Sequence, residues 1–202
     1  MNKKELLDLL RKEGFSEKII NAFSKVNREI FVPDELKEFA YENHPLPIGY
    51  GQTISQPYTI AFMLSLLDVK DGQKILEVGS GSGYVLALIN ELSKNLKIFG
   101  VEIIKELYEK SKKNLKSFKN IKVFNLDGTK GLLQESPFDR IIVSASADEI
   151  PRDLIKQLKT GGIMVIPVLN SIFSIKKEAK GNEIKEYPGF VFVPLRKDRH
   201  TK

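Results

Sequence analysis

Apolar residues recur through the first 40 positions with the spacing of amphipathic helices. The leucines of residues 6–10 form an apolar stripe, and Gly14 predicts the end of that helix. A second helix is expected after Ser16, a residue type that caps helix N-termini, and a third over residues 33–40, which begin with proline. The chain is therefore predicted to open with a helical extension.

The segment HPLPIGYGQTISQP, residues 44–57, interrupts this pattern with closely spaced prolines and glycines. Its polar residues are short, so we expect an ordered loop and not a flexible linker. From Gln56 to Leu67 the apolar spacing is again helical, and Ser55 is a candidate N-cap.

Short apolar runs then alternate with amphipathic segments, which predicts a parallel sheet with helices on both faces. Gly161 and Gly162 are expected to end the last of these helices. The expected strands are 74–78, 97–102, 122–126, 139–145 and 162–168, and the expected helices are 83–93, 104–118 and 152–159.

The C-terminal part predicts an antiparallel hairpin at the sheet edge, with strands over 170–178 and 189–195 and a turn near Gly181-Asn182. The expected fold is α/β and Rossmann-like, with an antiparallel edge of the kind that separates methyltransferase-like sheets from the all-parallel dinucleotide fold. At 202 residues, one domain is expected. It would comprise a helical extension and substrate loop (1–56), a cofactor-binding core (57–168), and edge strands with a basic tail (169–202).

The amino-acid composition excludes several kinds of catalytic and binding site. The absence of cysteine excludes disulfides and cysteine nucleophiles, and two distant histidines, His44 and His200, make a metal site unexpected. With no signal peptide or membrane-length apolar run, a cytoplasmic protein is expected. The net charge of +6 comes from lysines that alternate with acids along the helices, which favours a solvated surface over a dedicated nucleic-acid patch.

The motif LEVGSGSGY, residues 76–84, connects an expected strand to an expected helix. Its glycines permit a tight turn and close approach of a ligand, but a dinucleotide fingerprint would need a third glycine where Tyr84 stands. Glu77 would repel a pyrophosphate and attract the cationic methionine part of S-adenosylmethionine. The pattern therefore favours S-adenosylmethionine over a nicotinamide dinucleotide.

Acids also end the next two expected strands. Glu102 is suited to the ribose hydroxyls, and Asp127, followed by Gly128, to the adenine amino group, because strand ends of a parallel sheet share one crevice. The expected cofactor-binding residues are Glu77, Gly79, Ser80, Gly81, Gly83, Tyr84, Glu102, Asp127 and Gly128.

The acceptor is harder to predict. Gln52, Thr53 and Ser55 offer an amide and two hydroxyls between glycines and a proline. Residue types alone leave two interpretations open: Ser55 caps the following helix, or these donors bind an anionic or peptide-like acceptor.

Several blocks, in order, resemble the protein-L-isoaspartate O-methyltransferase family. They are LPIGYGQTISQP, LEVGSGSGY, SPFDRIIVSASADEIP, LKTGGIMVIPV and FVFVPLR. The resemblance implies methylation of the α-carboxylate of L-isoaspartyl residues in damaged proteins and peptides, which starts repair through a succinimide. It also implies a catalytic position for Ser55, with Thr53 beside the acceptor, and cofactor contacts from Gly79, Gly81, Glu102, Asp127 and Gly128. Asn43 and Thr129 depart from the family, where an acid and an aromatic residue are common.

Alternative functions are a nucleic-acid or small-molecule methyltransferase of the same fold and, from another class, a nicotinamide-dependent oxidoreductase. The segment SASADEIP, 144–151, lacks the Asn-Pro-Pro-Tyr type of loop that grips an exocyclic amine. We expect a monomer whose partners are isoaspartyl proteins and peptides, with no dedicated nucleic acid and no membrane.

Overall fold

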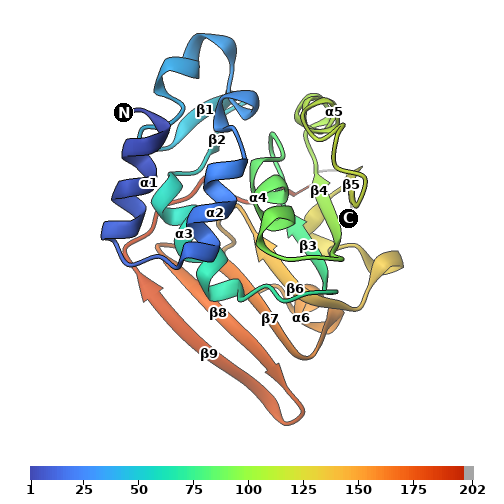
Figure 1. Cartoon of the computed structure of the whole chain (residues 1–202). Helices are drawn as coiled ribbons and strands as arrows, with labels where there is room; N and C mark the ends of the chain where they lie inside the picture. The colour runs from blue at the N-terminus through green and yellow to red at the C-terminus, as the bar shows by residue number, and fades with distance from the viewer. Residues whose placement is uncertain (198–202) are drawn as a thin grey trace.

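The computed structural model describes residues 1–197, and its centre is a seven-stranded sheet in the order β5-β4-β3-β6-β7-β8-β9 (Figure 1). Strands β3 to β7 run parallel, whereas β8 and β9 are antiparallel to their neighbours. The bounds are β3 (Lys74–Val78), β4 (Lys97–Glu102), β5 (Ile121–Asn125), β6 (Phe138–Val143), β7 (Leu158–Val168), β8 (Ser171–Glu178) and β9 (Gly181–Pro188). The expected mostly parallel sheet with an antiparallel edge is confirmed.

Helices cover both faces of this sheet, and α1, α2 and α3 group together on one side (Figure 1). The α-helices are α1 (Lys3–Lys12), α2 (Glu17–Lys25), α3 (Pro57–Leu67), α4 (Tyr84–Leu92), α5 (Lys105–Asn114) and α6 (Arg152–Gln157). Short 3-10 helices are η1 (Arg28–Phe31), η2 (Asp34–Phe39), η3 (Gly128–Lys130) and η4 (Leu133–Glu135), and β1 (Leu46–Gly49) pairs with β2 (Gln52–Ile54).

The central strands are buried on both faces because their alternate side chains enter two separate apolar clusters. In β3, Ile75 packs with the N-terminal helices and α4, whereas Leu76 packs with α6 on the other face. In β6, Ile142 lies in the same cluster as Ile75, and Ile141 lies in the same cluster as Leu76. This is why these strands read as continuous apolar runs in the sequence.

The strand order creates a switch point beside β3. The chain moves outward from β3 through β4 to β5, then returns to place β6 on the opposite side of β3. The connections therefore diverge at the carboxyl ends of β3, β4 and β6, which is where open α/β sheets bind ligands.

Two predicted elements near the C-terminus are present but have different bounds. The helix expected over 152–159 ends at Gln157, and the strand expected at 162–168 starts at Leu158, which pairs with Phe138. Strand β7 is held between β6 and β8, so Gly161 and Gly162 lie within it and do not end a helix.

The second hairpin strand is β9, Gly181–Pro188, and not 189–195. It pairs with β8 along its whole length, and the turn lies at 179–180. Because β9 is an exposed edge strand with polar residues on both faces, it lacks the apolar alternation that marks a strand. Residues 189–195 instead cross the carboxyl edge of the sheet, where the Leu195 amide donates to the Ser146 carbonyl oxygen at 2.7 Å.

The helix boundaries also differ. The helix expected over 104–118 spans only Lys105–Asn114. Gln56, not Ser55, occupies the N-cap position of α3, and neither makes a side-chain capping bond there. His200 lies outside the described residues. Within residues 1–197, no helix has the length and apolar character to cross a membrane.

Arg140 ties helix α3 to the sheet. Its side chain, 7% exposed, extends from β6, and Nε donates to the Leu67 carbonyl oxygen at 2.6 Å while Nη2 donates to that of Asp68 at 3.0 Å. These carbonyls end α3 and would otherwise lack helical partners.

We predict that Arg140→Lys lowers the free energy of unfolding by about 1.5–3 kcal/mol, because one ammonium cannot reproduce the guanidinium fork. Urea denaturation of parent and variant measures the change. Arg152→Lys, on the exposed first turn of α6, is the control and should leave stability unchanged. Equal stability of the parent and Arg140→Lys would contradict this role.

Candidate functional site

A crevice lies at the carboxyl ends of β3, β4 and β6. The β1–β2 hairpin and the segment 193–196 complete its walls. Its outer part is lined by Ile48, Gln52, Thr53, Val78, Gly79, Gly81, Val101, Glu102, Ile103, Ile104, Gly128, Ser144, Ala145 and residues 193–196. An adjoining inner part adds Ile54, Ser55, Glu77, Ser80, Ser82, Tyr84 and Val85. Most residues expected at the site from the sequence therefore come together.

The glycine turn follows β3 in a conformation that other residues rarely adopt. Gly79 and Gly81 have φ values of +77° and +52°. A Cβ added to Gly81 would lie 3.2 Å from Ile48 Cδ1, so the turn also passes close to β1. Its backbone therefore forms one wall of the crevice.

Glu102, at the end of β4, holds the turn from the opposite side. Its Oε2 accepts from the Gly81 amide at 2.8 Å and its Oε1 from the Ile104 amide at 2.9 Å. The side chain is 5% exposed, and burial raises its pKa although these amides oppose the shift. Because each carboxylate oxygen can accept a further hydrogen bond, Glu102 is able to bind a diol in the crevice.

Glu77 is the most deeply buried acid of the site, at 1% exposure. Its Oε1 accepts from the Ser144 hydroxyl at 2.6 Å. Its Oε2, like the Ser80 hydroxyl, has no hydrogen-bond partner among residues 1–197. Burial raises the pKa of Glu77 to about 8. A cationic group beside it would restore the ionised carboxylate, so the site fits the amino and sulfonium groups of S-adenosylmethionine.

Two other expected cofactor residues have clear packing roles. A Cβ on Gly83 would lie 2.8 Å from Leu115 Cδ1, so this glycine permits contact with the end of α5. The Tyr84 ring packs on Phe31 with centroids 5.3 Å apart, which attaches the helical extension to α4.

At the β5 end, Gly128 lines the crevice and packs against β3, where an added Cβ would lie 2.5 Å from Val78 Cγ1. Asp127 is absent from the lining residues of the described chain. Its Oδ1 accepts from the Thr129 amide at 2.9 Å and hydroxyl at 2.7 Å, which caps η3. Thr129, which replaces a common aromatic residue, thus orients Asp127.

A groove of about 870 Å³ adjoins the crevice on the other side of β2. It is lined by Pro45, Thr53, Ser55, Gln56, Tyr58, Thr59 and residues 188–194. Thr53 lines the groove and both parts of the crevice, so β2 forms the boundary between the two sites. Asn43 supports this boundary, because its Oδ1 accepts from the Tyr58 amide at 3.0 Å.

Sequence reasoning missed several wall residues. Ser144 follows β6 and reaches Glu77, a contact that depends on strand register and leaves no sequence signal. The segment 193–196 was expected within an edge strand and the FVFVPLR block, but it lines the crevice, and Arg196 Nη2 donates to the Tyr50 carbonyl oxygen at 2.8 Å.

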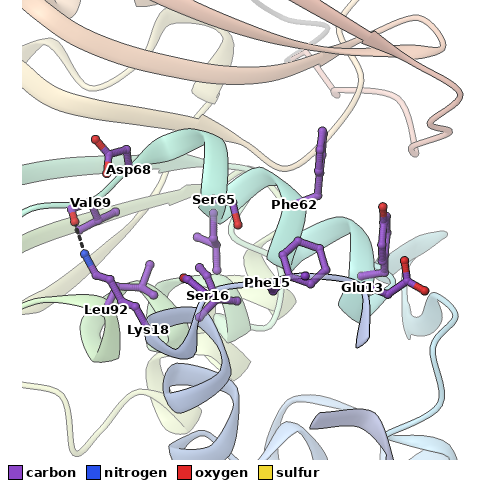
Figure 2. A pocket seen from close by; sticks show the side chains of 13 residues that line it. Glu13, Phe15, Ser16, Lys18, Phe62, Ser65, Asp68, Val69 and Leu92 are labelled. Atoms are coloured by element: carbon purple, nitrogen blue, oxygen red, sulfur yellow. Dashed lines mark hydrogen bonds between the residues drawn. The ribbon is translucent and has the colours of Figure 1, made fainter. Parts of the chain in front are cut away.

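A separate cavity of about 530 Å³ lies between the α1–α2 connection and α3 (Figure 2). Phe15, Phe62 and Lys18 line it, and Lys18 Nζ donates to the Val69 carbonyl oxygen. None of the residues expected at the site lines this cavity. Across the described residues, no cluster of three or more histidines and acids is suited to holding a metal ion.

The sheet order, the antiparallel edge and the glycine turn between two buried acids define a Rossmann-like S-adenosylmethionine-dependent methyltransferase. Comparison with known proteins identifies the family within this class. The family model described as protein-L-isoaspartate(D-aspartate) O-methyltransferase matches residues 1–200. The chain therefore belongs to that family. This membership confirms the enzyme class, the S-adenosylmethionine cofactor and the isoaspartyl methylation that the sequence predicted.

Relatives named protein-L-isoaspartate O-methyltransferase agree with this membership. One from Dictyoglomus turgidum is 46% identical over 96% of this chain and 90% of its own length. One from Methanothrix thermoacetophila is 44% identical over 96% and 95%.

Two solved structures are also similar. A structure entitled protein-L-isoaspartate O-methyltransferase has a TM-score of 0.88 at 26% identity and covers 96% of this chain but 66% of its own. One from Plasmodium falciparum, described as such an enzyme in complex with S-adenosyl-L-homocysteine, has a TM-score of 0.85 at 29% identity and covers 98% and 100%.

The first prediction from the site concerns Glu102. Glu102→Ala should weaken S-adenosylmethionine binding at least tenfold, about 1.4 kcal/mol, because it removes acceptors for the ribose and the support of the Gly81 amide. Isothermal titration calorimetry measures the affinity. Glu106→Ala, on the exposed first turn of α5, is the matched control. Unchanged affinity in folded Glu102→Ala would remove Glu102 from the site.

The second concerns the pH dependence of stability in the absence of cofactor. The pKa of Glu77 is about 8 in the folded chain against 4.5 as the ordinary value, so the folded state holds a proton that the unfolded state releases between these values. Folding therefore becomes less favourable as pH rises through this window. We predict that the stability of Glu77→Gln relative to the parent increases from pH 5 to 8 and then levels off, as measured by urea denaturation. A constant difference would contradict the burial effect.

Proposed function

We propose that Ser55 and Thr53 hold the α-carboxylate of an L-isoaspartyl residue for methylation, and that Glu77 and Glu102 hold S-adenosylmethionine in the adjoining crevice. The observation that carries this assignment is the position of Thr53, which lines both the acceptor groove and the crevice. An acceptor in the groove would thus meet the cofactor across one short strand.

Methyl transfer to this acceptor requires no proton transfer by the protein. S-adenosylmethionine supplies a methyl group activated by its sulfonium. The acceptor carboxylate is ionised at neutral pH, with an ordinary pKa of about 3.5–4, so its oxygen attacks without a general base. The chain's task is to align that oxygen with the carbon–sulfur bond that breaks as the new carbon–oxygen bond forms, and to exclude water. The peptide nitrogen that follows the isoaspartyl residue then attacks the ester carbonyl, which closes a succinimide and releases methanol.

The role of Ser55 rests on its surroundings. Ser55 lines both the groove and the inner crevice. Gln56 takes the N-cap position of α3, so the Ser55 hydroxyl is not used to cap this helix. This supports the interpretation that the hydroxyl donates to the acceptor carboxylate. Gln52, on the outer wall, is proposed to bind the acceptor backbone.

We also propose that residues 1–202 act as one methyltransferase domain, since 1–56, 57–168 and 169–202 all contribute walls to the site. A cytoplasmic monomer without a dedicated nucleic-acid partner remains the proposed state. The surface lysines support the absence of a dedicated nucleic-acid site, because many are paired with nearby acids, as in Lys112 with Glu109 and Lys156 with Asp153.

The proposal predicts that Ser55→Ala lowers kcat/KM for an isoaspartyl peptide about tenfold to a hundredfold, since losing a hydrogen bond to a charged group costs roughly 1.5–3 kcal/mol. Cofactor affinity and thermal stability should stay close to those of the parent. Methyl transfer to an isoaspartyl peptide, measured beside its normal aspartyl twin, gives the result.

Ser16→Ala is the matched control, because Ser16 also precedes a helix without making a capping bond but does not line the groove or the crevice. In Ser55→Asp the new charge should repel the acceptor carboxylate and reduce activity further. A stable Ser55→Asp variant as active as the parent would exclude Ser55 from acceptor binding. A parent that does not distinguish the two peptides would overturn the proposed substrate.

A further inference from the structure

Arg28, in η1, is a charged side chain placed entirely inside the protein. It is 0% exposed, and among residues 1–197 no carboxylate lies within ion-pair distance of it. Its Nε and Nη1 have no hydrogen-bond partner in that part of the chain. Burying an unpaired charge costs several kcal/mol, so packing alone does not account for an arginine here.

The contacts that Arg28 does make lie at the two halves of the site. Nη2 donates to the backbone carbonyl oxygen of Ser55 at 2.9 Å. The guanidinium carbon lies 5.0 Å from the centre of the Tyr84 ring, a cation–π arrangement. Ser55 belongs to the acceptor loop, and Tyr84 is the first residue of α4, directly after the glycine turn.

Arg28 remains a cation at neutral pH. Burial lowers its pKa to about 10, while the neighbouring Tyr84 and Tyr41 oppose the shift. Burial also raises the pKa of Tyr84 to about 12, and that of Tyr41 lies above its ordinary value for the same reason. Both phenols are therefore neutral wherever the enzyme would work.

We propose that Arg28 is a positioning residue for methyl transfer: its guanidinium fixes the Ser55 peptide against the helix that follows the glycine turn. This rests on the proposed role of Ser55. Ser55 and Tyr84 line the same inner part of the crevice, so a side chain that contacts both sets the distance between acceptor loop and cofactor turn. A small displacement of Ser55 would misalign the attacking oxygen.

A role of Arg28 in alignment and a purely structural role predict opposite effects of its replacement on stability and on kcat. Replacement of a buried charge by an apolar side chain of similar volume is often neutral or stabilising. If Arg28 serves alignment, Arg28→Met keeps or increases the free energy of unfolding and yet lowers kcat. If it serves folding alone, Arg28→Met loses stability and the folded fraction keeps the parental kcat.

The first experiment measures unfolding, cofactor affinity, KM and kcat for Arg28→Met, with Arg152→Met on the exposed turn of α6 as control. We expect kcat for an isoaspartyl peptide to fall tenfold or more, with cofactor affinity changed less than about threefold. A parental kcat in the folded variant would overturn the proposal. The activity of the parent is measured in the same experiment. A parent inactive on the isoaspartyl peptide would contradict the proposed function, whereas an active parent with an equally active Arg28→Met would contradict only the role of Arg28.

Arg28→Lys tests the cation even if Arg28→Met folds poorly. A buried ammonium has a lowered pKa, and Tyr84 and Tyr41 face it without titrating below pH 9. We expect partial kcat near pH 6.5 that declines more steeply than the parent's as pH rises to 9. A pH profile parallel to the parental one would contradict the role of the charge.

A double-mutant cycle tests whether Arg28 acts through Ser55. With no hydroxyl left to orient, Arg28→Met in the Ser55→Ala background should reduce kcat less than about threefold further. If the losses of the two single variants instead multiply, Arg28 acts independently of Ser55 and the proposal fails.

Discussion

The hydrogen bond between the Glu102 carboxylate and the Gly81 amide links the ends of two of the three strands from which the site is built. It holds the end of β4 against the turn that follows β3, and the turn in turn sets the position of α4. Gly81 reaches this bond only because it has a positive φ, and Glu102 is held in place by a second amide, from Ile104. Both parts of the crevice and the attachment of the helical extension to α4 depend on this geometry.

The interior around that bond contains polar groups that the described chain leaves unsatisfied. Glu77 Oε2, the Ser80 hydroxyl and two nitrogens of Arg28 are buried without hydrogen-bond partners among residues 1–197. Such groups lower the stability of the folded chain. Their concentration around the glycine turn and the acceptor loop indicates that folding energy is given up for binding and alignment.

The sequence was informative wherever a local pattern decided the structure. Strands β3 and β4 match the predicted bounds because both faces are buried, and Gly79, Gly81 and Glu102 line the crevice at the switch point. The class of cofactor followed from charge, through Glu77 beside the turn.

Positions set by long-range packing were not predictable. Strand β9 forms by pairing with β8 and carries no apolar alternation, and Ser144 meets Glu77 through the register of β3 and β6. Arg28 lies in an ordinary amphipathic run, and nothing local shows that its side chain turns inward toward Ser55. For the acceptor loop, residue types left two interpretations open, and only the helix start at Pro57 removed the capping role.

The contact between Arg196 and Tyr50 joins residues 146 positions apart. By contrast, the glycine turn and its two acids come from residues 74–102, a single β-α-β unit with local connections. During synthesis on the ribosome this unit can thus form early, whereas the wall that residues 193–196 add to the crevice must wait until those residues have emerged. Because long-range contacts close slowly, we expect the crevice to be completed late in folding, after the β-α-β unit has formed.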